Sequence, residues 1–118
     1  MADPYTCRHV EIKDGDQAVA AAQVSTWQQA GGTAQASLRA VPGHLPPGTR
    51  ARLVDAVMDL PEVQASAHLQ ASVPLGDTES LWRLWERTEE AATRPAGSTA
   101  MVDAQLPRRS EPGIRPRA

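Results

Sequence analysis

The sequence predicts an α/β (α+β) domain of two layers, in which two helices cover one face of a mixed five-stranded sheet. Two patterns indicate this class. In five segments apolar residues alternate with polar ones, which is typical of a strand with one buried face. In two others apolar residues recur every three or four positions, as on a helix with one buried side. The segments follow in the order β-β-β-α-β-α-β, and 118 residues suffice for one domain.

The first third of the chain predicts an antiparallel meander of three strands. Asp14-Gly15 and Gly31-Gly32 supply the positive φ that tight hairpin turns require. The polar and apolar alternation is most regular after the second of these turns. The three strands are expected at residues 8–13, 18–29 and 33–41. The alanine run in the second segment also suits a helix, but Val24 to Trp27 are mostly β-branched or aromatic and favour a strand.

A loop rich in Pro and Gly at 42–48 precedes the first predicted helix, which runs from Thr49 to Leu60 and stops before Pro61. The clearest strand signal follows, because residues 63–73 alternate strictly between apolar and polar types. Strands that the chain enters through a helix are expected to lie parallel to their neighbours.

The second helix is predicted from Asp77 or Thr78 to about Arg94, with Leu84 and Trp85 on its inner face. Trp82 lies about one step round the helix from that face. Since exposed tryptophan is enriched at interfaces, Trp82 is an interface candidate, with a place at the edge of the core as the alternative.

The last strand is expected at residues 99–106, which completes the predicted domain at 8–106. Residues 1–7 are expected to form a flexible N-terminus. Residues 107–118 contain four Arg and three Pro and are expected to form a disordered tail.

Charge and composition exclude several classes of protein. The formal net charge is −2, which divides into −5 for residues 1–106 and +3 for the tail. An acidic body argues against binding duplex nucleic acid, so any such contact would be made by the tail. One cysteine, Cys7, excludes an internal disulfide. No apolar run is long enough to span a bilayer or to mark a secretory signal, so the expected location is the cytoplasm.

No motif predicts a cofactor or a metal. Walker A, G-x-G-x-x-G, G-x-S-x-G and HExxH sequences are absent, and His9, His44 and His68 lack the spacing of metal ligands. Cys7 and His9 would share a strand face, but nothing nearby indicates a thiol nucleophile.

The open face of the predicted sheet is the first candidate surface. It collects short polar side chains, and the residues proposed to bind there are Trp27, Arg39, His68, Gln70 and Asp103. The leading hypothesis is a small non-enzymatic binding or regulatory domain that acts through this face or by self-association, its partner being a second copy or another protein. The alternative for the face itself is plain solvation, which is common in antiparallel sheets.

A competing hypothesis comes from the element order, which resembles the start of the ribonuclease H-like fold. That resemblance implies a metal-dependent nuclease, in which carboxylates on the first strand, the first helix and after the fourth strand hold two magnesium ions. The matching acids are Asp14 or Asp16, Asp55, and Asp77. Their other interpretation is structural, since Asp14 and Asp16 lie in a turn and Asp77 is placed to cap a helix.

Overall fold

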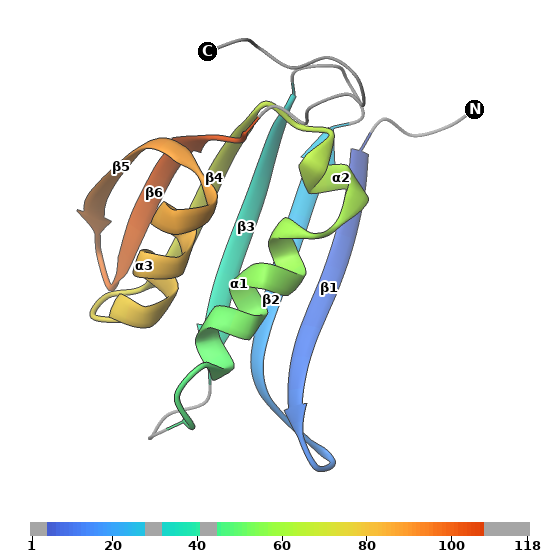
Figure 1. Cartoon of the computed structure of the whole chain (residues 1–118), viewed down its shortest axis with the longest axis vertical. Coiled ribbons are helices and arrows are strands. Elements are labelled where there is room, and N and C mark those ends of the chain that lie inside the picture. Colours follow the sequence, from blue (N-terminus) through green and yellow to red (C-terminus); the bar gives the residue numbers. More distant parts are fainter. Residues whose placement is uncertain (1–4, 28–31, 41–44, 108–118) are drawn as a thin grey trace, which may run out of the picture.

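The computed structural model describes residues 5–27, 32–40 and 45–107, except for the side chains of Tyr5 and Trp27. In this part of the chain, a mixed six-stranded sheet and three helices form a two-layer α+β fold, with the helices on one side of the sheet (Figure 1). The helices span four to ten residues, too short to cross a bilayer. The elements are β1 (Tyr5–Asp14), β2 (Gln17–Trp27), β3 (Thr33–Ala40), α1 (Thr49–Met58), α2 (Pro61–Gln64), β4 (His68–Pro74), α3 (Thr78–Arg87), β5 (Glu89–Ala96) and β6 (Thr99–Gln105).

The strand order across the sheet is β1-β2-β3-β4-β6-β5. Neighbouring strands are antiparallel except for the central pair, β3 and β4, which are parallel. This parallel pair arises because the chain returns from β3 to β4 through α1 and α2, as crossover connections require. The meander β1-β2-β3 agrees with the prediction from the sequence.

The core lies between the sheet and the helices. Leu53, Val54 and Val57 of α1 and Leu84 of α3 are buried against the inner sheet face. That face is built largely from alanine and valine, with Leu38 and Leu69 as its largest members. The alternation in β4 works as predicted: Leu69 is buried and His68 is exposed.

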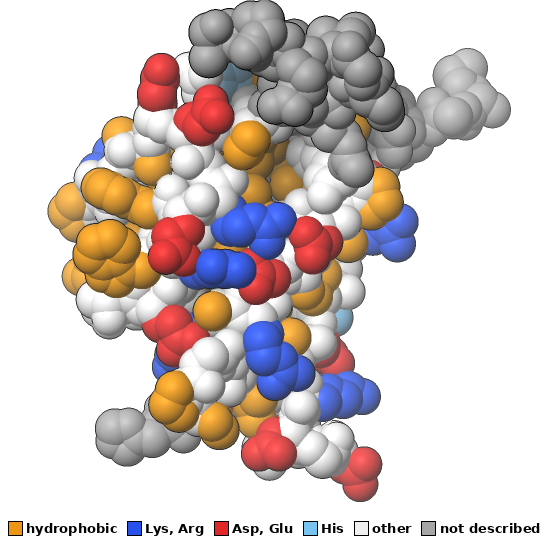
Figure 2. Space-filling model, viewed as in Figure 1, with side chains coloured by type: hydrophobic (Ala, Val, Ile, Leu, Met, Phe, Trp, Pro, Cys, Tyr) orange, Lys and Arg blue, Asp and Glu red, His pale blue; other side chains and the backbone are white. Residues whose placement is uncertain are grey.

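Ion pairs join α1 to α3 on the outer side of the helical layer. Both side-chain oxygens of Asp55 accept hydrogen bonds from Arg83, at 2.7 and 3.0 Å. Arg87 donates to Asp55 at 2.8 Å and to Asp59 at 2.9 Å. The charges form the alternating red and blue cluster in the middle of Figure 2. These ion pairs therefore add a charged contact between the two helices.

The sheet has six strands, and the prediction of five was wrong because β5 was read as the end of the second helix. Glu89 to Ala92 are residues that a helix tolerates. The helix nevertheless ends at Arg87, since Thr88 is extended with φ −130° and ψ 175°. Glu90 has a φ of 53°, and the pairing of β5 with β6 shifts register there. Pairing with β6 thus overrides the local helix preference.

Two further differences concern β4 and β6. The predicted strand 63–73 begins only at His68, because Pro61 opens the short helix α2 and Val63 is buried beneath it. The alternation of apolar and polar residues over 63–67 therefore belongs to α2 and the residues after it, and not to a strand. β6 is antiparallel to β4, contrary to expectation, because the unforeseen β5 reverses the chain before it.

The two edges of the sheet differ in their strands. β1 forms one edge and pairs with β2 along its whole length. β5 forms the other, and its side chains are almost all exposed. Pro95 lies in β5 and has no N–H to donate. The chain enters β1 at Tyr5, and the predicted tail from residue 108 lies outside the described residues.

Candidate functional site

The central parallel strands separate at their carboxyl ends. Pairing between β3 and β4 ends at Ser37 and Ser72. Beyond this point β3 continues to pair with β2 as far as Ala40, and β4 continues to pair with β6 as far as Pro74. The ladder between the two middle strands therefore ends before either strand does, and we call this end of the β3–β4 pair the split.

A shallow hollow lies on the open face beside the last paired positions of β3 and β4. Its volume is about 380 Å³. Gln35 and Gln70 lie opposite each other in the sheet and are joined by a hydrogen bond of 3.2 Å from Gln35 Nε2 to Gln70 Oε1. The lining residues are Gln23, Ser25, Gln35, Ala36, Ser37, Gln70, Ser72 and Met101. This polar lining offers hydrogen bonds without a fixed charge.

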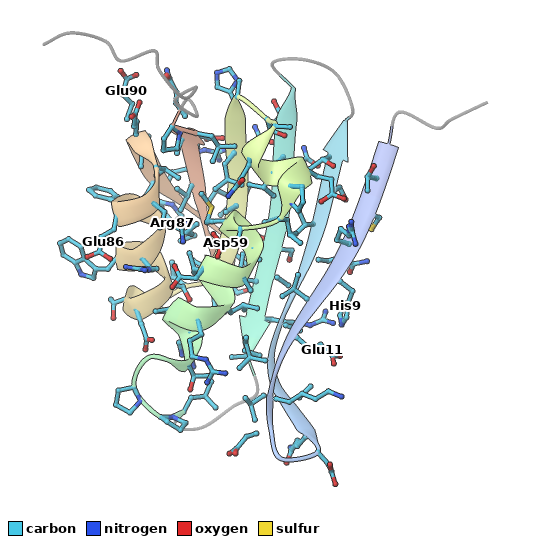
Figure 3. All side chains as sticks on the ribbon, turned by 45° about the vertical axis from the view of Figure 1, so that its right-hand side comes forward. His9, Glu11, Asp59, Glu86, Arg87 and Glu90 are labelled. Atoms are coloured by element: carbon cyan, nitrogen blue, oxygen red, sulfur yellow. The ribbon has the colours of Figure 1, made fainter. Side chains whose placement is uncertain are left out.

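A second hollow of about 260 Å³ adjoins the last residues of β3 on the side where β3 pairs with β2. His9, Glu11 and Arg39 contribute its charged and titratable groups, and alanines and Val19 form the rest. His9 Nε2 lies 3.1 Å from Glu11 Oε2 (Figure 3). Because residues two apart on a strand share a face, the His-x-Glu sequence of β1 produces this pair directly.

Helices α1 and α3 begin at the same end of the sheet as the split, because α1 follows β3 and α3 follows β4 in the chain (Figure 1). Gly48 precedes α1 with a φ of 91°, a conformation that suits glycine. Asp77 caps α3 by accepting a hydrogen bond from the Ser80 amide at 3.1 Å. The carboxyl ends of parallel strands and the helix N-termini after them are where ligands of α/β proteins commonly bind.

Carboxylate groups already accept hydrogen bonds at the end of the sheet where α1 and α3 begin. Glu79 Oε2 accepts a hydrogen bond of 3.0 Å from the amide of Ala51 in the first turn of α1. Arg50 in the same turn donates to Asp77 Oδ2 at 3.0 Å. An anionic ligand at the start of α1 would therefore compete with Glu79 for a backbone donor.

The residues predicted to form a binding face are only partly brought together. Gln70 lines the first hollow and Arg39 the second. Asp103 lies opposite Gln70 on β6 and 4.0 Å from Arg94, outside both hollows. His68 begins β4, at the end of the sheet opposite the split. Trp27 closes β2, and its side chain lies outside the described part.

The acids of the nuclease hypothesis are not arranged as metal ligands. Asp14 and Asp16 flank the turn between β1 and β2. Asp55 is bound by two arginines, and Asp77 is the cap of α3. The hydrogen bond from Arg83 lowers the pKa of Asp55 below its ordinary value. Within residues 5–27, 32–40 and 45–107, no three His, Cys, Asp or Glu side chains could hold a metal ion together.

Comparisons with known proteins add information at the level of the fold. No protein-family model and no curated protein matches the chain. Solved structures do match. A proposed acetyltransferase from Sphaerobacter thermophilus aligns over 95% of this chain and 71% of its own, with a TM-score of 0.58 and 14% identity. The chain has an acetyltransferase-like fold.

Two further structures agree. An acetyltransferase of the GNAT family from Streptococcus pneumoniae aligns over 83% of this chain and 65% of its own, at 10% identity and a TM-score of 0.58. A proposed acetyltransferase from Salmonella typhimurium, solved with its cofactor acetyl-CoA, aligns over 86% and 64%, at 12% identity and a TM-score of 0.55. The chain thus spans about two thirds of the length of these acetyltransferases.

These neighbours overturn both functional hypotheses drawn from the sequence. All three are described as acetyltransferases, which corrects the expectation of a non-enzymatic binding or regulatory domain. The nuclease alternative is also wrong, because β4 lies beside β3 in an acetyltransferase-like sheet and Asp55 and Asp77 are held by arginines.

The sequence did not predict the split or the His9–Glu11 pair. The His-x-Glu spacing in a predicted strand could have revealed the second of these, whereas no residue pattern marks where β3 and β4 part.

Proposed function

We propose that this chain binds an acyl-CoA thioester in the split between β3 and β4 and transfers its acyl group to an acceptor on the open sheet face. The observation that supports this most is the end of β3–β4 pairing at Ser37 and Ser72 in a fold similar to that of acetyltransferases. Amide groups of an extended ligand arm can pair with strand edges as an added strand would. The Salmonella neighbour, which was solved with acetyl-CoA, gives the choice of ligand.

The open face would hold the acceptor. Acyl transfer joins an acceptor nitrogen or oxygen to the carbonyl carbon of the thioester, breaks the carbon–sulfur bond, and releases the thiol after a proton reaches the sulfur. The acceptor must lose a proton on the way, which a histidine can remove. His9 is suited to this role, because Glu11 accepts a hydrogen bond from Nε2 and leaves the lone pair on Nδ1. Arg39 in the same hollow would attract an acceptor that carries an anionic group.

The phosphate groups of the ligand would bind at the first turn of α1. The amides of a helix N-terminus attract anions, but here Glu79 already accepts from the amide of Ala51. Replacing Glu79 by glutamine removes one negative charge and weakens the competing contact. The same substitution leaves the side chain almost unchanged in size.

The first test is isothermal titration of the protein with acetyl-CoA. We expect saturable binding with one ligand per chain, and we expect Glu79→Gln to bind several-fold more tightly than the unmodified chain. Glu86→Gln is the matched control, since it removes the same charge from α3 at an exposed position away from α1's first turn. The absence of binding by both the unmodified chain and Glu79→Gln at millimolar acetyl-CoA would reject the proposal.

A further inference from the structure

An exposed pair of tryptophans on α3 takes no part in the site described above. Trp82 is 67% exposed and Trp85 is 48% exposed, although Trp85 was predicted to face the core. Their rings pack edge to face, with centroids 6.4 Å apart and an interplanar angle of 62°. Trp85 Nε1 donates to Thr93 of β5 at 3.1 Å, which fixes the orientation of this indole.

The two indoles form the wall of an apolar hollow between α3 and β5. The volume is about 270 Å³, and the lining residues are Thr78, Leu81, Trp82, Trp85 and Thr93. Apolar side chains project at this side of the molecule in Figure 2, over α3. Monomeric proteins rarely leave two neighbouring large aromatic side chains uncovered unless something binds them. We call this hollow the tryptophan groove.

Acidic side chains border the tryptophan groove. Glu86 lies one helical turn after Trp82 on α3, with its side chain 60% exposed and 3.0 Å from Arg83. Glu89 and Glu90 follow at the start of β5, and both are exposed. Figure 3 shows Glu86 and Glu90 on the same side of the molecule. Arg83, which pairs with Glu86, and Arg94 of β5 are the cations near these three carboxylates, so negative charge is in excess here. This excess would attract a cationic partner, and the guanidinium group of arginine stacks well on indole.

The chain itself supplies such a partner. Residues 108–118 contain Arg108, Arg109, Arg115 and Arg117 together with Pro112 and Pro116. Prolines in an extended segment pack on tryptophan-lined grooves, which are a common binding site for proline-rich peptides. Arginine and proline are thus the two side-chain types that the tryptophan groove and its acidic border would recognise.

The tail also begins in the right place. Gln105, two residues before the end of the described chain, lies opposite Glu89 in the sheet and donates to Glu90 Oε1 at 3.0 Å. From Glu90 to Thr93 is three strand residues, or about 10 Å. The eleven residues that follow Pro107 can reach about 34 Å when extended. The tail is therefore long enough to cross from the acidic border to Trp82.

We infer that residues 108–118 cover the tryptophan groove of their own chain, with arginines stacked on the indoles of Trp82 and Trp85 and paired with the acidic border.

Oxidative footprinting of the full-length protein tests this inference, because hydroxyl-radical labelling read by mass spectrometry reports each tryptophan separately. In the variant with all four tail arginines changed to serine, we expect Trp82 and Trp85 to be oxidised several-fold faster than in the unmodified chain. Met101, which lies on the opposite sheet face, serves as the internal reference. Lys13→Ser is the charge control, since Lys13 lies in β1 near the hairpin. Equal rates for both tryptophans in the two proteins would overturn the inference.

A reciprocal measurement follows the tail instead. Trypsin cleaves after arginine, so cleavage at Arg108 and Arg109 reports whether the tail is covered. Trp82→Ser removes an exposed side chain and should fold, and we expect it to be cut several-fold faster in the tail than the unmodified chain. Unchanged cleavage would contradict docking. Protection of the tryptophans that rises with protein concentration would also contradict it, because it would show that the tail of a second copy fills the groove.

Discussion

His9 is the residue on which the proposed chemistry depends most. Its ring is oriented by Glu11, and the pair lines a hollow beside the last residues of β3. An oriented imidazole acts as a general base only where it has access to the acceptor. Its position on the open face gives the access.

Replacing His9 should therefore affect turnover more than ligand binding. We expect His9→Ala to lower kcat for acyl transfer by roughly 100-fold, the usual scale of a general base, with little change in the Kd of acetyl-CoA. A thiol-release assay with a panel of amine acceptors measures kcat, and isothermal titration measures the Kd of acetyl-CoA. His68→Ala is the matched control, because His68 lies at the opposite end of β4 and lines neither hollow. If the two variants lose activity equally, His9 is not the base.

Leu69 is the residue that tests the register of the central sheet. It is 1% exposed, and its neighbour His68 is exposed. We expect Leu69→Asp to cost several kcal/mol, a large part of the ~5–15 kcal/mol that typically stabilises a domain, because it buries an unpaired charge. His68→Asp should change the free energy of unfolding little. Chemical denaturation of both variants measures the difference, and similar losses would show that the register is wrong.

At the scale of single side chains, the sequence was most informative about strand faces. Strict alternation correctly placed Leu69 inside and Gln70 on the open face, because a one-residue shift would have exposed every apolar residue of β4. It failed for Trp85, whose spacing fits the helix stripe but whose indole turns toward Thr93 of β5. The strand that supplies this partner was not predicted, so no pattern on α3 alone could have placed the ring.

The carboxylate of Asp55 on α1 is shared between two arginines of α3, Arg83 and Arg87. The hydrogen bond from Arg83 lowers the pKa of Asp55, opposed by partial burial and helped by Arg87. A carboxyl group whose folded pKa lies below its ordinary value of 3.8 stabilises the fold above that pH. The stabilisation is lost as the pH falls through the folded pKa. Glu62 adds acid sensitivity of the same sign, because its own amide and Arg8 lower its pKa.

Asp55→Asn isolates this contribution. At neutral pH we expect a loss of about 1 kcal/mol in the free energy of unfolding, since the Asp55 side chain is one-third exposed and solvent screens the pairs. The difference between variant and unmodified protein should begin to shrink as the pH falls below about 3.8, where the unfolded chain takes up a proton, and should vanish below the lower folded pKa, where the native carboxyl group is protonated as well. Urea denaturation at several pH values measures it. Asp16→Asn removes the same charge from the β1–β2 hairpin and is the control. A difference that stays constant with pH would contradict the linkage.

The elements that the sequence missed are those whose formation depends on distant partners. α2 and β5 are short or polar, and their residues have no apolar face of their own. β5 exists because it pairs with β6, and the bulge at Glu90 allows the chain to leave α3 and enter the sheet at once. Long amphipathic elements such as α1 were predicted from their own residues, because their burial pattern is local.

At the scale of the whole molecule, the order of the strands decides the function that can be proposed. The sequence predicted the meander and the crossover to β4, but it did not predict that the crossover strand lies beside β3 or that the pair separates. Those two facts create the split. Strand order is set by how all elements pack together, so neither composition nor spacing contained it.

Pro95 and the bulge at Glu90 have a consequence for how copies of this molecule can associate. A strand from a neighbouring molecule cannot form a continuous ladder along β5, because Pro95 has no N–H and the strand is irregular between Glu89 and Ala92. β1 has no proline and pairs with β2 over ten residues. A sheet with one usable edge can join one other sheet and then has no edge left. For the residues that the structure describes, strand addition at β1 would therefore join two molecules edge to edge and leave β5, interrupted by Pro95, at each outer edge.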